Sequence, residues 1–161
     1  MHEMLMSLAQ WLEASPWGAP TRTTTWFYPY VQLTHFTGLS LWLGTNIALD
    51  MRLIGIGRWK RTAAELADDL FVWNWIGFCI VVTGGFMLFS ATATTYLANP
   101  AFEVKLGMLV PTAVMWHVIV QRRALTWGKA PEVTGAGRLA GLVELLLWLA
   151  VVTAAVLIPS Y

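Results

Sequence analysis

Four long apolar stretches alternate with short polar connections along this chain. They cover residues 29–50, 70–91, 100–121 and 136–158. A helix needs ~20 apolar residues to cross a hydrocarbon core of ~30 Å, and each stretch reaches that length. A backbone in lipid must satisfy its polar groups internally, so each stretch is expected to be a helix. The pattern predicts an all-α fold, an integral membrane four-helix bundle in which residues 1–161 form a single transmembrane domain.

A shorter amphipathic segment precedes the first stretch. Met4, Leu5, Leu8, Trp11 and Leu12 recur at helical spacing, but this segment is too short to span a bilayer. We predict a short N-terminal interfacial helix that lies flat in the outer interface, where it could cover an outward-facing site. No basic residue precedes its apolar part, so it is not expected to act as a secretory signal.

The composition argues against a soluble protein. Of the 161 residues, 57% are hydrophobic and 12% are charged, whereas soluble domains carry roughly 25% charged residues. Ten Lys and Arg nearly balance nine Asp and Glu, so the net charge of +1 indicates no nucleic-acid partner. The single cysteine, Cys79, excludes an intramolecular disulfide and a cysteine-based metal cage.

Basic residues collect in the first and third connections between the apolar stretches. These residues are Arg52, Arg58, Lys60 and Arg61, followed by Arg122, Arg123 and Lys129. Because cytoplasmic loops are enriched in Lys and Arg, we predict a multi-pass protein of the bacterial inner membrane with both termini outside, N-out and C-out. The lipid bilayer is its first expected partner. A protein this small is also expected to form a homo-oligomer or to join a larger membrane complex.

Ionisable groups within a membrane span are costly, which makes them the first candidates for a functional site. His35 lies six residues after Pro29, and Lys105 lies five residues after Pro100. At 1.5 Å per residue, these two side chains are about 9 Å and about 8 Å deep. Met87, four residues before the outer end of the second stretch, falls at a similar height. Three helices therefore offer an imidazole, an amine and a thioether to one layer.

Each of these three residues also has a purely structural interpretation. His35 could hydrogen-bond to a neighbouring helix. Lys105 could extend its amine to the outer headgroups, and Met87 could serve only in packing. The residues alone leave these interpretations open.

A second group of polar residues is expected near the cytoplasmic face. Its members are Asn46, Asp50, Asn74, His117 and Glu144, and they come from all four predicted helices. His117 differs in height from His35 by roughly 16 Å, so the two histidines are not expected to ligate one haem. We expect a hydrogen bond between His117 and Glu144, or a contact of either residue with Arg122 or Arg138.

Two sequence patterns are similar to known membrane protein families. In the first stretch, His35 is followed seven residues later by Trp42 and then by Gly44. This order resembles the opening helix of the HemJ and CopD-type families, in which a His precedes Trp-x-Gly. The third stretch contains Lys105-Leu106, Trp116-His117 and Arg122-Arg123. These pairs resemble the Lys-Leu pair, aromatic-His pair and basic residues of HemJ proteins, with a Lys-to-His distance one residue longer.

The HemJ resemblance implies a haem b held by the first-helix His and the third-span Lys, which are His35 and Lys105 here. It also implies an oxidase that acts on protoporphyrinogen. The CopD resemblance implies periplasmic copper handling. A further likeness, to a family of short bacterial membrane proteins with no established activity, covers nearly the whole chain. It rests on TWFYPYVQLTHFTGLSLWLGTNIALDMRLIG, NPAFEVKL and RLAG.

We therefore predict a haem b-binding inner-membrane protein in electron transfer or membrane redox chemistry, and we leave open whether it is an enzyme. His35 would be the proximal ligand, with its other ring nitrogen bonded to a backbone carbonyl or hydroxyl. Lys105 would ligate iron after losing its proton, with Met87 as the substitute ligand and Trp42 packed against the macrocycle.

Two alternatives belong to other functional classes. The first is a non-enzymatic accessory subunit of a larger membrane complex, with or without a pigment, since a single His can also hold a chlorophyll-type magnesium. The second is CopD-like copper handling.

Overall fold

The computed structural model describes residues 2–57, 60–127, 129 and 132–157, and within these ranges it contains helices and no strand. Its longest helices are α3 (Phe27–Ile54), α4 (Ala63–Ala91) and α8 (Gly135–Leu157). A fourth long segment runs without a break through α6 (Pro100–Val104), a π-helical turn η1 (Lys105–Leu109) and α7 (Val110–Trp127). The predicted all-α fold is confirmed.

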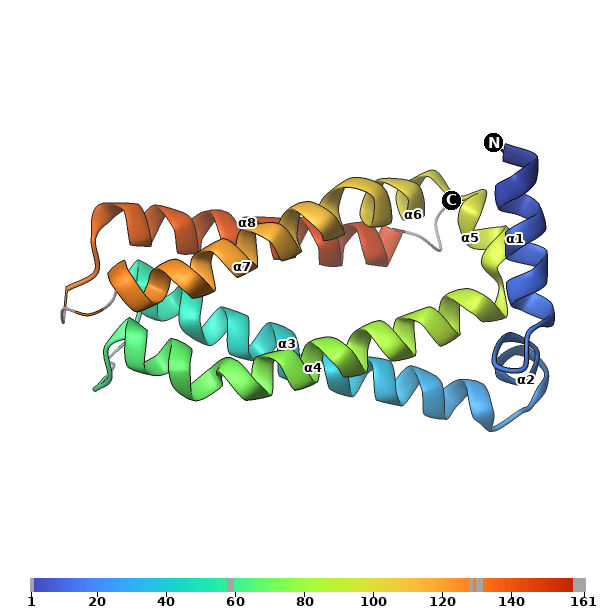
Figure 1. The fold of residues 1–161 in the computed structure, drawn as a ribbon, viewed down its shortest axis with the longest axis horizontal. Helices are drawn as coiled ribbons and strands as arrows, with labels where there is room; N and C mark the ends of the chain where they lie inside the picture. Colours follow the sequence, from blue (N-terminus) through green and yellow to red (C-terminus); the bar gives the residue numbers. More distant parts are fainter. Residues whose placement is uncertain (1, 58–59, 128, 130–131, 158–161) are drawn as a thin grey trace.

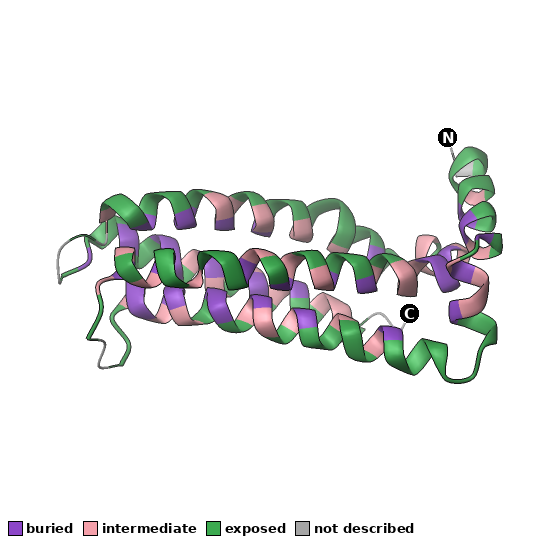
Figure 2. Ribbon diagram, turned by 60° about the horizontal axis from the view of Figure 1, so that its bottom comes forward, coloured by how far each residue is buried: buried purple, intermediate pink, exposed green. Residues whose placement is uncertain are grey.

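The four long segments pack around a shared interior. Helix α3 contacts α4 and α8, and α7 contacts the same two helices. Figure 1 shows two antiparallel pairs, α3 with α4 and α7 with α8, whose connecting loops lie at one end of the molecule. Buried positions face the interior, and exposed positions cover the outside (Figure 2).

Three of these segments are long and apolar enough to cross a membrane: Ala63–Ala91, Pro100–Trp127 and Gly135–Leu157. Helix α3 is not among them, because polar residues such as Gln32, His35 and Asp50 interrupt its apolar sequence. The composition therefore supports membrane spanning for three of the four predicted stretches.

The helices extend beyond the predicted apolar stretches. Helix α3 has 28 residues, which corresponds to about 42 Å. Helix α4 begins seven residues before position 70, because Thr62 and Glu65 form a capping box. The third segment continues to Trp127 instead of position 121. Position 158, the predicted end of the last stretch, lies outside the described residues, and α8 is described to Leu157.

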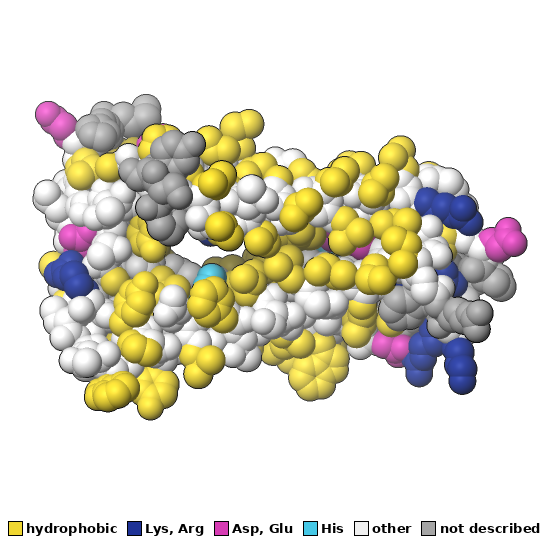
Figure 3. Space-filling model, turned by 180° about the vertical axis from the view of Figure 1, so that it is seen from behind, with side chains coloured by type: hydrophobic (Ala, Val, Ile, Leu, Met, Phe, Trp, Pro, Cys, Tyr) yellow, Lys and Arg dark blue, Asp and Glu magenta, His cyan; other side chains and the backbone are white. Residues whose placement is uncertain are grey.

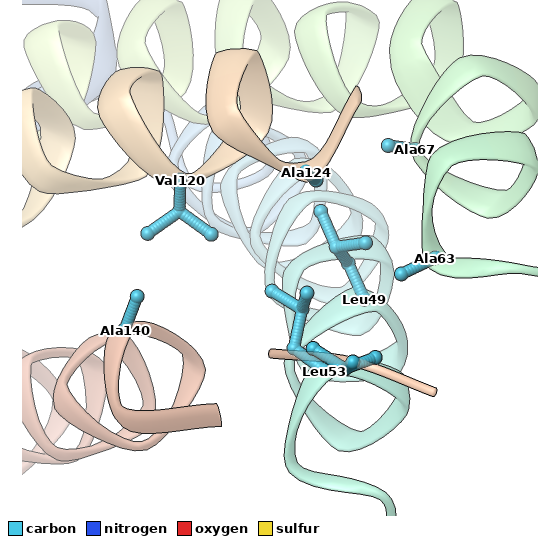
Figure 4. Packing of buried hydrophobic residues seen from close by; sticks show 8 residues of the cluster. Leu49, Leu53, Ala63, Ala67, Val120, Ala124 and Ala140 are labelled. Atoms are coloured by element: carbon cyan, nitrogen blue, oxygen red, sulfur yellow. The ribbon is translucent and has the colours of Figure 1, made fainter. Parts of the chain in front are cut away.

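Small side chains bring the helices together at the end with the connecting loops. Figure 4 shows the cluster there, which consists of Leu49, Leu53, Ala63, Ala67, Val120, Ala124, Val133 and Ala140. Four of its members are alanines, which allow neighbouring helix backbones to approach closely. This end of the bundle is consequently the more tightly closed one.

Three short helices close the opposite end: α1 (His2–Ala14), α2 (Gly18–Thr23) and α5 (Ala93–Leu97). Helix α1 lies across the bundle end (Figure 1) and packs on α5 through Ala9, Leu12 and Ala93. The remaining apolar side chains of its predicted stripe, Met4, Leu5, Leu8 and Trp11, are exposed. The predicted N-terminal helix is thus present, and its position in the membrane interface stays a prediction.

Glu13 ties α1 to α5. Its Oε1 accepts hydrogen bonds from the Thr94 backbone N–H (2.8 Å) and hydroxyl (2.6 Å), and Arg22 lies 3.4 Å from its Oε2. Burial opposes ionisation of this carboxyl. The Thr94 hydrogen bonds and the Arg22 charge outweigh it, so the pKa of Glu13 is lowered from its usual value.

Candidate cofactor site

A cavity of about 380 Å³ lies between the α3–α4 pair and the α6–η1 segment, near the end that α5 closes. It is lined by Tyr28, Gln32, His35, Phe36, Gly85, Leu88, Phe89, Tyr96, Phe102, Lys105 and Ala155. Figure 3 shows the molecule hollowed between its helices toward this end. The volume falls in the range of ~300–1,000 Å³ that is usual for small-molecule and cofactor sites.

His35 is held in the cavity wall by α4. Its Nδ1 lies 2.8 Å from the backbone carbonyl oxygen of Val81. A Cβ at Gly84 would come within 2.9 Å of the His35 Cα, and one at Gly85 would come within 3.1 Å of the ring. Two consecutive glycines therefore make room for the backbone and the imidazole of His35. The predicted backbone acceptor for this histidine is confirmed.

The hydrogen bond to Val81 determines which His35 nitrogen is free. Because a carbonyl oxygen only accepts, Nδ1 carries the proton and donates it. Nε2 then keeps its lone pair, which is the arrangement found for metal-ligating histidines. His35 can therefore act as a ligand through Nε2 without rearrangement.

Lys105 lines the same cavity as His35, and the two side chains are close enough to interact electrostatically. Both residues thus line one cavity, as a shared layer would require, and their equal depth in a membrane stays a prediction. Lys105 opens the π-helical turn, in which the Val110 N–H donates to the Lys105 carbonyl. Pro111 accounts for this turn, because proline offers no N–H to the carbonyl of Gly107 and crowds it. Such turns are frequent at functional sites.

Aromatic rings form the wall beside α5. Phe89 and Phe102 stack with their centroids 5.4 Å apart, and Tyr96 lies 4.9 Å from Phe102. Burial, and then the neighbouring Tyr28, raises the pKa of Tyr96, so its phenol stays neutral. Flat apolar walls of this kind suit a planar aromatic ligand.

The other two predicted cofactor contacts, Trp42 and Met87, are not among the residues that line the cavity. Trp42 is buried beside Trp148 and Phe78, at centroid distances of 4.4 Å and 4.9 Å. Met87 is half-buried on α4. Their roles as macrocycle contact and substitute ligand stay predictions, which this arrangement does not strengthen.

The second polar group forms a connected network in the bundle core. His117 Nδ1 lies 2.5 Å from Glu144 Oε1, and His117 Nε2 lies 3.0 Å from Asn74 Oδ1. Asn74 Nδ2 donates to Thr45 Oγ1 at 2.8 Å and also to Asn46 Oδ1. The predicted hydrogen bond between His117 and Glu144 is confirmed. His117 does not line the cavity of His35 and Lys105.

The donor set fits a macrocycle better than a bare metal ion. In the part of the chain that the structure describes, no three His, Cys, Asp or Glu side chains gather as a protein metal site would require. Haem iron takes four ligands from the porphyrin and needs only one or two from the protein. A single oriented histidine in a largely aromatic cavity meets that need.

Sequence reasoning missed the residues that position His35. Val81 contributes only its backbone, which carries no signature in the sequence. Gly84 and Gly85 form a visible Gly-Gly pair within an apolar stretch, a sign of close backbone approach. That pair alone does not reveal which helix approaches.

Comparisons with known proteins return no relative. No protein-family model matches the chain, and no curated protein and no solved structure is significantly similar to it. The resemblance to the HemJ and CopD-type families, and to the short bacterial membrane proteins, therefore rests on the quoted residues alone.

Proposed function

We propose that this chain is a four-helix inner-membrane protein that binds haem b in the cavity lined by His35 and Lys105, and that it acts in electron transfer or membrane redox chemistry. One observation carries the proposal. His35 stands in the wall of a cofactor-sized cavity with Nδ1 bonded to the Val81 carbonyl and Nε2 free to ligate.

Bound haem would supply a centre that accepts and releases one electron. The protein's own residues hold and orient it. His35 Nε2 offers a lone pair, and the Gly84–Gly85 pair keeps the imidazole against α4. Lys105 offers either a neutral amine as a second ligand or a charged amine as a partner for a carboxylate of the ligand. Phe89 and Phe102 form an apolar wall on the α5 side.

The proposed topology places α3 across the membrane together with the other three segments. Helix α3 packs along α4 and α8, so it would cross wherever they cross. The α3–α4 and α7–α8 connections lie at the same end (Figure 1), and Lys and Arg gather at that end in Figure 3. Under the positive-inside rule, this end faces the cytoplasm, which gives N-out and C-out.

An absorption spectrum of the purified full-length chain tests the proposal, with His35→Ala and His117→Ala as a matched pair. We expect a haem b spectrum in the wild type, no retained haem in His35→Ala, and retained haem with lower bundle stability in His117→Ala. Equal loss of haem in both variants would contradict the assignment. A chlorophyll-type spectrum would favour the pigment-binding alternative, and no pigment under haem-replete expression would favour the accessory-subunit alternative.

A further inference from the structure

Two carboxyl groups lie side by side in the bundle core. Asp50 on α3 and Glu144 on α8 are 0% and 1% exposed. The helices touch here, because a Cβ at Gly141, three residues before Glu144, would lie 3.5 Å from the Asp50 Cα. Both oxygens of Asp50 and the Oε2 of Glu144 have no hydrogen-bond partner among the described residues. Two ionised carboxylates cannot persist next to each other in such an environment. At least one proton must be bound between them.

The hydrogen bonds that lead from Thr45 to His117 determine the charge of the His117–Glu144 pair. Thr45 Oγ1 donates to the backbone carbonyls of Leu41 and Trp42, at 3.0 Å and 2.8 Å, so it must accept from Asn74 Nδ2. Asn74 then presents its Oδ1 to His117 Nε2, which must donate.

The remaining contact, between His117 Nδ1 and Glu144 Oε1, therefore contains one proton, on either atom. In both cases the pair of His117 and Glu144 carries no net charge. Trp148 Nε1, 3.4 Å from the same oxygen, adds a donor without adding charge.

No described cationic group bonds to either carboxyl oxygen of Asp50. The other charged residues of the four long segments that lie toward the loop end are Arg52, Glu65, Asp68, Asp69, Arg122, Arg123 and Arg138. Arg52 is the only buried one among them, and its Nε donates to the Arg61 carbonyl oxygen at 2.8 Å. An ionised Asp50 would leave the cluster with one uncompensated negative charge, whereas a protonated Asp50 leaves it neutral.

We propose that Asp50, Glu144 and His117 form a buried proton-binding site in which Asp50 carries an exchangeable proton. Binding transfers a proton from water to one Oδ of Asp50, and the new O–H donates to Glu144 Oε2. Glu144 keeps its bond to His117, no other bond changes, and the charge of the cluster goes from −1 to 0. This inference does not depend on what the cavity of His35 binds.

The location of Asp50 indicates where this proton comes from and what it does. Asp50 lies four residues before the end of α3 at Ile54, about 6 Å along the helix, so the loop end is its nearer route to water.

The new hydrogen bond joins α3 to α8 beside Gly141, where a Cβ would come within 3.2 Å of the Asp50 carbonyl. Loss of the proton would remove this bond and leave an ionised Asp50 facing the lone pairs of Glu144 Oε2. Proton release should therefore loosen the α3–α8 contact.

Infrared spectroscopy of the full-length protein in lipid nanodiscs tests the site. We expect a C=O band of a protonated carboxylic acid at neutral pH, shifted in D2O and lost reversibly as the pH is raised. Asp50→Asn should remove this band. Asp68→Asn, which changes an exposed carboxylate on α4, should leave it in place.

Glu144→Gln supplies a second variant that keeps Asp50 and replaces the carboxyl beside it with an amide, and it should shift the band. The absence of the band from the wild type at neutral pH would overturn the proposal, whatever the variants do. A band that is unchanged in both Asp50→Asn and Glu144→Gln would overturn it as well. So would a band that persists at every pH at which the protein stays folded.

Discussion

Gly84→Ala is a direct test of how closely α3 and α4 must approach to hold His35. The added Cβ would lie 2.9 Å from the His35 Cα and Cβ, whereas ordinary contacts begin at 3.4 Å. These atoms belong to a helix backbone and the base of a side chain, so they cannot swing aside. The two helices would have to separate by about 0.5 Å, which would lengthen the 2.8 Å bond from His35 Nδ1 to Val81 to about 3.3 Å.

Gly44→Ala is the matched control, because a Cβ at Gly44 in the middle of α3 would meet nothing within 4 Å. Both variants gain up to ~1 kcal/mol of helix propensity, so this gain cancels between them. Overpacking costs typically ~1–3 kcal/mol, and only Gly84→Ala incurs it. We expect its free energy of unfolding to be lower than that of Gly44→Ala by that amount.

The assay is thermal unfolding of both variants in the same detergent, followed by circular dichroism. At roughly 2–4 °C per kcal/mol, the Tm of Gly84→Ala should lie about 2–12 °C below that of Gly44→Ala. Equal Tm values would show that α3 and α4 are not packed through Gly84, and the account of how His35 is held would be wrong. This readout is independent of any cofactor.

Three further predictions concern topology, the second ligand and the N-terminal helix. In a background without the native cysteine, Cys at Thr94 should react with an impermeant reagent from the periplasmic side and Cys at Thr126 should not; the reverse pattern would invert the topology. Lys105→Arg should shift the absorption of the oxidised haem-loaded protein, because arginine stays protonated and cannot ligate, while Met87→Leu should leave it unchanged. Because the folded-state pKa of Glu13 is lowered, ionised Glu13 stabilises the contact between α1 and α5 fully above the ordinary pKa of a glutamate. This stabilisation is lost as the pH falls through the folded-state pKa. Hydrogen exchange of α1 should therefore accelerate at acidic pH in the wild type, measured against Glu13→Gln at the same pH, and identical exchange in the two proteins would refute this role.

Hydropathy located the helical segments well because lipid-facing side chains must be apolar along most of a span. It placed some ends wrongly because other forces determine them. Helix α4 starts at Ala63, where a Thr62–Glu65 capping box satisfies the first backbone N–H groups in a polar stretch. Helix α3 ends at Ile54, where Gly55 adopts a φ of +92°. Such signals lie outside the apolar windows.

The candidate site was partly accessible from the sequence for a similar reason. Helical rise gives the height of a residue, and the two residues that it put at one level, His35 and Lys105, line one cavity. Rise does not say how far apart two helices lie at a given height. Trp42 shares a helical face with His35, yet it lies where the bundle has closed, against Trp148. The partners of His35 depend on tertiary packing that no single-helix pattern contains.

The π-helical turn at Lys105–Leu109 changes the rotational phase of the third segment. Lys105 and His117 are twelve residues apart, and in a plain α-helix they would point about 120° away from each other, at ~100° per residue. A π turn accommodates one extra residue, so the two side chains are related as if eleven residues separated them, with an angular offset of about 20°. The turn thus directs Lys105 and His117 to the same side of the segment.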